Sequence, residues 1–262
     1  MPPRRPRRSR SRPRPRVRMS TRTRFIVTVI AVVVLAVVGL GTRGLDLFRG
    51  EDGSADGSGA AASRAASPLP AGLTAQQALD SLETKGKAAR TGYSRDAFGA
   101  RWADVDHNGC DTRNDILARD LTQITLRPGT CKVATGVLKD PYTGRRIDFT
   151  AGAQTSAAVQ IDHVVALSDA WQTGAQQLST ADRMALANDP LNLLAVDGPA
   201  NNGKSDGDAA TWLPEQKSFR CEYVARQAGV KRKYDLWVTR AERAAMVGRG
   251  DRRLPAVSYT HL

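Results

Sequence analysis

One uncharged, apolar run near the N-terminus constrains this chain more than any other feature. Residues 25–41 read FIVTVIAVVVLAVVGLG, seventeen residues without a charge, bounded by Arg24 and Arg43. This length is at the low end of what spans a bilayer as a helix. The chain has a single run of this kind, which excludes a protein with several membrane spans. We therefore expect one transmembrane or signal-anchor helix.

The basic residues are concentrated ahead of this run. The chain has 39 Lys and Arg against 26 Asp and Glu, a formal charge of +13. Residues 1–24 hold eleven arginines and no acid, which leaves 28 basic against 26 acidic residues elsewhere. Positive flanks stay on the cytoplasmic side, so a cytoplasmic N-terminus and an exported C-terminal part are expected. The rest of the chain is nearly neutral, so its net charge does not predict that it binds a polyanion. Evidence for such binding must come from specific residues.

Two fates stay open for the apolar run. A signal peptide is cleaved at small residues placed directly behind its apolar segment. Leu40-Gly41-Thr42-Arg43 stands in that place, and an Ala-rich stretch begins only at Ala60. The sequence therefore favours an uncleaved, single-pass anchor with an extracellular C-terminal domain, and a secreted protein is the alternative.

Composition divides the chain into five parts. Residues 50–72 are rich in Gly, Ala, Ser and Pro, which is typical of a flexible spacer. The last residues resemble translated adapter sequence. The expected parts are an Arg-rich cytoplasmic tail (1–24), the apolar segment (25–41), a linker (42–72), one domain (73–248) and a tail without functional weight (249–262).

The domain has the pattern of an α+β fold, with helices around small antiparallel hairpins. Short apolar runs predict the strands, and capping residues or amphipathic runs predict the helices. We expect strands over 131–137, 146–149 and 157–161 and from Asn192, and helices over 111–121, from Pro199, over 219–234 and after the capping box Thr239-x-x-Glu242.

Three cysteines, Cys110, Cys131 and Cys221, lie on the side of the membrane that we expect to be oxidising. Cys110 and Cys131 are the preferred pair, because a disulfide that closes a loop of about twenty residues stabilises a fold by about 3 kcal/mol. Cys221 is then left over, as a thiol or as a partner between molecules. A zinc site is not expected, since the chain has no Cys-x-x-Cys and few histidines.

The search for a general base is short, because the chain has three histidines, His107, His163 and His261. Asp162-His163 follows the strand expected over 157–161 and leads into a further apolar run. In such a setting a carboxylate and an imidazole are costly unless they are paired or used. An isolated Asp-His pair is more often structural than catalytic, so its meaning depends on what accompanies it.

A second segment supplies the accompanying residues. This segment has the pattern of a strand, a turn and a helix. Asn192 begins the strand, and the helix carries Asn201 and Lys204 three residues apart on one side. Carboxylate and amide oxygens are ligands that Mg²⁺ accepts while it keeps several waters. The sequence therefore predicts a divalent metal between Asp162 and Asn201, with Mg²⁺ as the first choice and Mn²⁺ as the alternative. His163 would face the same cavity.

This constellation resembles the HNH, or ββα-metal, nucleases. The step of nine residues from Asn192 to Asn201 also occurs in the HNH domain of RNA-guided CRISPR effectors. More widely, the chain is similar to an exported single-domain HNH endonuclease family, related to the C-terminal domain of GmrSD-type restriction endonucleases. The similar pieces are Gly92 to Arg95, Cys110 to Leu117, Asp140 to Gly144, Asp162 to Val165, Asn188-Asp189 and Trp212 to Pro214. The resemblance covers about residues 74–248 and implies a ββα-metal core embedded in helices.

The resemblance also implies roles in phosphodiester hydrolysis, which requires an activated water and neutralised charge at phosphorus. His163 would deprotonate the water, and Asn192 would orient the imidazole. A metal on Asp162 and Asn201 would stabilise the developing charge. Lys204 would contact a phosphate or buttress the helix. A capping role for Asn192 and a solvated helix face for Lys204 stay open.

Other residues carry weaker signals. One segment matches most of a calcium-loop pattern, with Asp in place of the final Glu; its candidate ligands are Asp104, Asp106, Asn108 and Asp115. A calcium ion bound there would be structural. Arg113 is a candidate phosphate contact, with an intrahelical salt bridge as the plainer alternative. Members of the resembling family usually end in a further cysteine that pairs with the position of Cys221, and this chain departs from that pattern.

We therefore expect a metal-dependent endonuclease on the exported side of the membrane, with DNA rather than RNA as substrate and no obligatory protein partner. The alternative is a membrane-tethered domain that binds nucleic acid or a cell-surface polymer without cutting it. Basic residues over 217–233, which would line one side of a helix, favour such binding. A binding domain has no need of a base beside two metal ligands, so Asp162, His163 and Asn201 favour the enzyme. A toxin domain delivered to other cells is a third interpretation.

Overall fold

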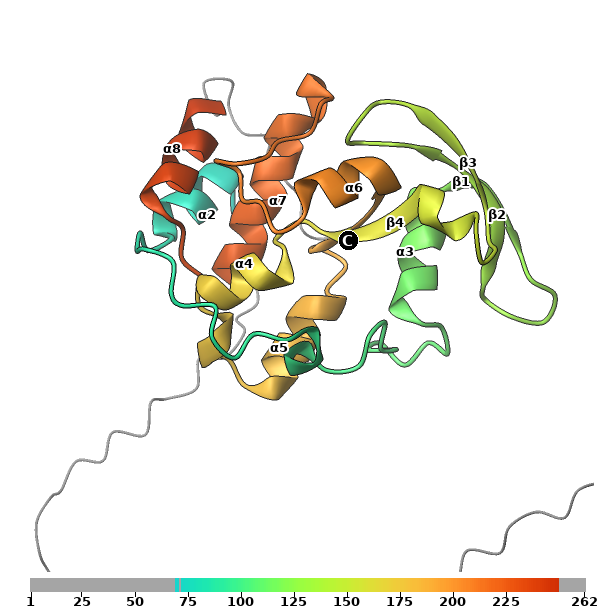
Figure 1. Ribbon diagram of the computed structural model, residues 1–262, viewed down its shortest axis with the longest axis horizontal. Coiled ribbons are helices and arrows are strands. Elements are labelled where there is room, and N and C mark those ends of the chain that lie inside the picture. Colours follow the sequence, from blue (N-terminus) through green and yellow to red (C-terminus); the bar gives the residue numbers. More distant parts are fainter. Residues whose placement is uncertain (1–68, 71, 250–262) are drawn as a thin grey trace, which may run out of the picture. The chain divides into compact units, whose positions relative to one another are not determined.

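The structure is a computed structural model that describes residues 69–70 and 72–249. Within these residues the protein is a mixed α+β fold of short helices and two small antiparallel sheets (Figure 1). The elements in chain order are α2 (Ala75–Ser81), η1 (Arg95–Phe98), α3 (Thr112–Asp120), β1 (Thr122–Leu126), β2 (Val133–Lys139), β3 (Arg146–Thr150), η2 (Ser156–Ala158), β4 (Val159–His163), α4 (Leu167–Gln172), η3 (Ala175–Gln177), α5 (Thr180–Asn188), β5 (Leu193–Asp197), α6 (Gly198–Lys204), η4 (Lys217–Phe219), α7 (Arg220–Lys233) and α8 (Arg240–Arg249).

The unit formed by β4, β5 and α6 positions the candidate site. β4 and β5 are antiparallel, with His163 opposite Leu193. α6 begins directly after β5 because the carboxylate of Asp197 accepts a hydrogen bond from the N–H of Ala200 at 2.8 Å, and a proline occupies the first turn. The strand, turn and helix predicted from the sequence are confirmed.

Gly198 allows the close contact at this turn. A Cβ atom at this position would lie 2.1 Å from the carbonyl oxygen of Ala157 in η2. Any side chain would therefore push α6 away from the beginning of β4. The close approach keeps Asn201 of α6 within reach of Gln160 of β4.

The connection between β4 and β5 contains α4, η3 and α5. Ser179 caps α5 by accepting a hydrogen bond from the N–H of Asp182. α5 ends at Asn188, so the carbonyl groups of its last turn lack partners within the helix. One of these groups, the carbonyl of Ala187, meets the end of β4.

The second sheet has the strand order β1-β2-β3. Its β2–β3 hairpin turns at residues 140–144, as the sequence predicts. The buried carboxylate of Asp140 accepts the N–H of Thr143 within the turn and the N–H of Asp197 at the start of α6. Ile116 and Leu117 of α3 share a buried cluster with apolar residues of both sheets. These contacts fix the two sheets and α3 relative to one another.

α7 is buried between α2, α8 and the β4–β5–α6 unit (Figure 1). The expectation that the basic residues over 217–233 line one side of a helix and bind a polymer is wrong for Arg226 and Lys231, whereas Lys217 is exposed. Lys231 is fully buried, with Nζ 2.7 Å from Glu242 and 3.2 Å from Asp169, and Arg226 is 7% exposed. These cations neutralise carboxylates or bind backbone carbonyls in the interior instead of facing a polymer.

Several predictions fall outside the described residues. They are the cytoplasmic tail (1–24), the membrane segment (25–41), nearly all of the linker (42–72) and the C-terminal residues from 250 onward. In the part of the chain that the structure describes, no helix combines the length and the apolar character that a membrane crossing needs.

Candidate active site

The imidazole of His163, at the end of β4, is held by the last turn of α5. Nε2 lies 2.8 Å from the carbonyl oxygen of Ala187. A carbonyl only accepts hydrogen bonds, so Nε2 carries the proton and Nδ1 presents a lone pair. The ring is partly buried and lies parallel to the indole of Trp102, with a centroid distance of 6.1 Å and an angle of 9°. The side chain thus has the tautomer and the fixed orientation that a general base needs.

His163 is also neutral at physiological pH. Burial is the main cause that lowers the pKa of its imidazole to about 4, and the bond to Ala187 opposes this effect. The positive charges of Lys204, Arg95 and Arg101 add to the lowering of the pKa. A neutral imidazole can accept a proton from water.

Asp162 precedes His163 on β4 and is buried. Its Oδ1 lies 3.0 Å from Nζ of Lys204, and its Oδ2 accepts a hydrogen bond from the hydroxyl of Tyr142 at 2.5 Å. Burial raises the pKa of the carboxyl group, and the charge of Lys204 and the hydrogen bonds oppose this. Each carboxylate oxygen has two lone pairs, so these bonds leave acceptor capacity for a cation.

Lys204 is an interior residue. Its side chain is fully buried, and Nζ binds the carboxylate of Asp162 and, at 2.8 Å, the backbone carbonyl of His163. This position corrects two of the three roles that the sequence left open, since a buried ammonium is neither a solvated helix face nor a contact for a phosphate. It agrees with the third role, a buttress between α6 and the end of β4.

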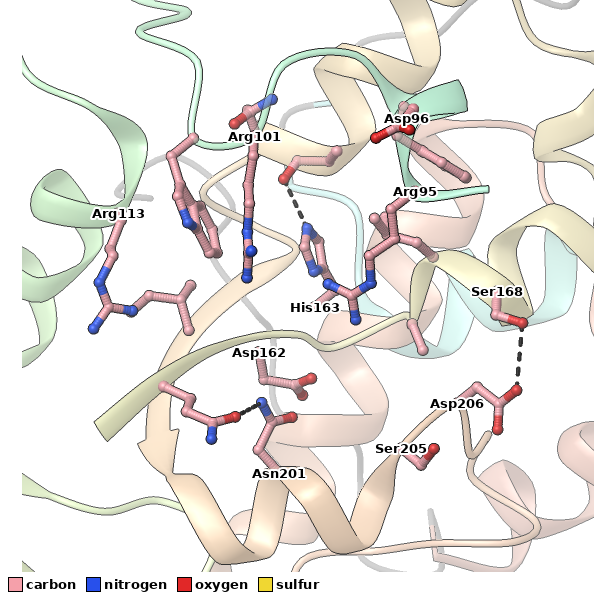
Figure 2. Close-up of a pocket in the computed structure, with 18 of the residues that line it drawn as sticks. Arg95, Asp96, Arg101, Arg113, Asp162, His163, Ser168, Asn201, Ser205 and Asp206 are labelled. Atoms are coloured by element: carbon pink, nitrogen blue, oxygen red, sulfur yellow. Dashed lines mark hydrogen bonds between the residues drawn. The ribbon is translucent and has the colours of Figure 1, made fainter. Parts of the chain in front are cut away.

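Asn201, one turn earlier on α6, is partly buried and donates through Nδ2 to Oε1 of Gln160 at 2.9 Å. This bond leaves its carbonyl oxygen for other partners. Figure 2 shows the amide of Asn201 next to the carboxylate of Asp162, and both side chains line one cavity. The structure thus places at one cavity the two oxygen-bearing side chains that the sequence pairs as candidate metal ligands.

Asn192 does not contact the imidazole directly. It is fully buried; its Oδ1 accepts the N–H of Val165 at 2.8 Å, and its Nδ2 donates to the carbonyl of Leu186 at 3.2 Å. The sequence expectation that Asn192 itself orients the ring is corrected. Asn192 instead joins the chain just after His163 to the turn of α5 that carries Ala187.

The candidate residues Asp162, His163 and Asn201 line a cavity of about 1100 Å³ (Figure 2). The chain around η1 forms another wall of this cavity and contributes Arg95 and Arg101 to its lining. Arg113 of α3 lines it too, and its guanidinium donates to the carbonyl of Val159 at 3.2 Å. Among the described residues, Arg113 forms no intrahelical salt bridge.

Sequence patterns do not identify Arg95, Arg101, Trp102 or Ala187 as site residues. Arg95 lies in the short 3-10 helix η1, and Arg101 and Trp102 lie in the loop after it. Neither segment is long enough for a hydrophobic period to indicate which side chains face a cavity. Ala187 contributes a backbone carbonyl, which no side-chain motif reveals. The one available signal was the similarity of the piece that ends at Arg95 to the HNH family.

The chain matches the family model of the C-terminal domain of GmrSD restriction endonucleases over residues 111–249, more than half of its length and all of β4, β5 and α6. The chain belongs to this family. It is also similar to a protein described as an uncharacterised secreted protein of Arthroderma benhamiae, with 37% identity over 180 residues that cover 68% of this chain and 84% of the relative. No solved structure matches the chain.

Membership of the GmrSD C-terminal family indicates a nuclease-related function, and hence a nucleic-acid substrate. The matched region contains Asp162, His163, Asn192, Asn201 and Lys204. Arg95 and Arg101 precede it, so one wall of the cavity is formed by chain outside the family model.

The calcium loop is not supported. The amide of Asn108 occupies its centre and donates to Asp106 at 3.0 Å and Asp115 at 3.2 Å, while Asp104 accepts the N–H groups of Asn108 and Gly109. Hydrogen bonds within the loop thus already use the carboxylates of Asp104, Asp106 and Asp115. Across residues 69–70 and 72–249, no group of three or more His, Cys, Asp or Glu side chains is placed to hold a metal ion.

A disulfide joins Cys110 and Cys131, the pair that the sequence favours. It links the loop before α3 to the turn between β1 and β2. Cys221, in the first turn of α7, is partly buried and takes no part in this bond.

Proposed function

We propose that this chain is a divalent-metal-dependent endonuclease of the HNH, or ββα-metal, type, which hydrolyses phosphodiester bonds of nucleic acid, DNA in preference to RNA. One observation carries the proposal: the neutral imidazole of His163, fixed through Nε2 by Ala187, shares a cavity with the oxygen donors Asp162 and Asn201. Two antiparallel strands and a helix that follows the second strand directly provide these residues, which is the order of a ββα-metal core.

His163 would act as the general base, with Nδ1 accepting a proton from the attacking water. Asp162 and Asn201 would hold the metal. They fit a small divalent cation because both offer hard oxygen atoms at a polar cavity, and the cation would keep water as its remaining ligands. When bound, the metal would supply positive charge that stabilises the phosphorane and the leaving oxygen.

The other predicted residues would act through these three. Lys204 holds the carboxylate of Asp162 and the backbone of His163, so it fixes one ligand and the base relative to α6. Asn192 fixes the turn of α5 that binds the imidazole. Arg113 lines the cavity and would contact a phosphate.

We propose that the enzyme acts on the exported side of the membrane. Three observations support this: the description of the Arthroderma benhamiae relative as a secreted protein, the disulfide between Cys110 and Cys131, and the apolar run at residues 25–41 behind an Arg-rich tail. The run would act as an anchor or, if cleaved, as a signal.

Digestion of supercoiled plasmid DNA and of RNA by the full-length protein tests the proposal. Cutting should require Mg²⁺ or Mn²⁺, stop in EDTA and be lost in His163→Ala, while His107→Ala, at an exposed position outside the cavity, should cut like the parent. If folded protein cuts neither polymer under any of these conditions, the non-catalytic binding domain becomes the better account.

A further inference from the structure

The cavity carries three arginines without a carboxylate partner. The ion pairs of the described residues involve other cations, and none joins Arg95, Arg101 or Arg113 to an acid. Asp96 lines the same cavity on η1, is exposed and pairs with none of the three. Three like charges at one cavity repel one another unless an anion lies between them.

The other carboxylates of the cavity are paired with basic side chains other than these three arginines. Asp162 is paired with Lys204, and Asp206, at the far end, lies 3.5 Å from Arg90. The three arginines therefore present an excess of positive charge to whatever enters, although the whole domain is nearly neutral.

The guanidinium groups also lie in a definite order. Figure 2 shows Arg113, Arg101 and Arg95 across the cavity, with His163 between Arg101 and Arg95 and with Asp162 below. They come from separate places in the chain: Arg113 from α3, Arg101 from the loop after η1, and Arg95 from η1 itself. Three guanidinium groups in this order suit a ligand that carries several negative charges along its length, as the backbone of a nucleic-acid strand does.

We propose that Arg113, Arg101 and Arg95 bind successive phosphates of one nucleic-acid strand and place the scissile phosphate between Arg101 and Arg95, in front of His163. This inference rests on the proposed function and adds its substrate class: a strand with at least one phosphate on each side of the bond that is cut. A guanidinium suits the role because its planar fork binds two oxygens of a phosphate at once. An isolated phosphodiester, which has no flanking phosphate, should be a poor substrate.

Cutting kinetics test the contacts one by one, with full-length protein and a single-stranded oligodeoxynucleotide. Arg95→Ala and Arg101→Ala should each lower kcat/KM by roughly 100-fold. Arg95→Lys and Arg101→Lys should recover part of the loss, because lysine keeps the positive charge without the planar fork. Arg127→Ala is the control, because Arg127 is exposed after β1 and outside the cavity, and it should leave kcat/KM unchanged. One phosphate beside the scissile bond is then replaced by a neutral methylphosphonate. This change should slow the parent but leave the variant that lacks the matching arginine unaffected, because both changes remove one contact.

Binding in EDTA separates this inference from the proposed function. Fluorescence anisotropy of the labelled oligonucleotide over a salt series should show that Arg95→Ala and Arg101→Ala each reduce the slope of log K against log salt by about 0.7. The N-terminal arginines are present in every variant and cancel in the comparison. If the slopes change but the parent cuts nothing, the phosphate row stands and the nuclease proposal fails. If the slopes and the methylphosphonate effects are unchanged, the row is wrong, whether or not cutting falls.

Discussion

Replacing Lys204 by methionine isolates the buried ion pair behind the candidate base. The Lys204 side chain is 0% and that of Asp162 6% exposed, with Nζ and Oδ1 3.0 Å apart. Methionine has a similar volume, so the change removes the charge while packing is largely kept. Breaking a buried pair from one side costs about 3–5 kcal/mol, because the remaining charge has no partner. For a domain of this size that is a fall in melting temperature of roughly 10 °C.

The same variant should acquire a pH dependence of known sign. Burial raises the pKa of Asp162, and the charge of Lys204 is the largest opposing influence. Without Lys204, the folded state holds a proton on Asp162 that the unfolded chain releases above about pH 4, so the stability of Lys204→Met should fall as the pH rises. Thermal unfolding followed by circular dichroism at pH 5 and pH 8 measures both effects.

Two further variants make this test specific. Adding Asp162→Asn to Lys204→Met should recover part of the lost stability, because a neutral amide needs no counter-ion. Lys139→Met, at an exposed position of β2, is the matched control and should melt with the parent. If Lys204→Met melts with the parent, or if Asp162→Asn recovers nothing, the buried ion pair does not stabilise the fold as described.

Three other predictions follow from the site and its supports. In metal-free protein, folding lowers the pKa of His163 from 6.5 to about 4, so between these pH values the unfolded chain binds a proton that the folded chain does not. The free energy of unfolding should therefore fall as the pH drops through this range. Urea denaturation of the parent and of His163→Gln measures this, and a difference between them that stays constant with pH would contradict the prediction. Asn201→Ala should raise the Mg²⁺ concentration for half-maximal cutting by about tenfold or more, whereas Asn202→Ala, at its exposed neighbour, should not; equal effects would argue against Asn201 as a ligand. Cys131→Ser should lower the free energy of unfolding by about 3 kcal/mol, as should reduction of the parent, and an unchanged melting curve in both cases would show that the disulfide contributes nothing.

The parts of the fold that could be predicted are those with local signals. Asp197 and Pro199 mark the start of α6 within a few residues, and Thr239 and Glu242 cap α8 through reciprocal hydrogen bonds. The β2–β3 hairpin follows from its alternating strands and the turn between them. These elements are determined by neighbours in sequence, and the structure has them where the sequence places them.

The remaining features depend on contacts between distant parts of the chain. Lys204 lies on a short helix, and only the packing of α6 against β4 brings the carboxylate of Asp162 to it. Lys231 of α7 is buried in the same way, because α8 supplies Glu242 as its partner. The carbonyl of Ala187 reaches His163 from another element, 24 residues away in sequence. Sequence patterns give the chemical types at the site, and tertiary packing decides which of them support the chemistry and which take part in it.

The central claim is that the imidazole of His163 activates the attacking water, and chemical rescue tests it most directly. Full-length His163→Gly is assayed on plasmid DNA with Mg²⁺, with and without added imidazole, and each reaction is repeated in EDTA. We expect no cutting by the variant alone and metal-dependent cutting that rises with the concentration of free imidazole base. Cutting by His163→Gly at the parental rate without imidazole would contradict the claim.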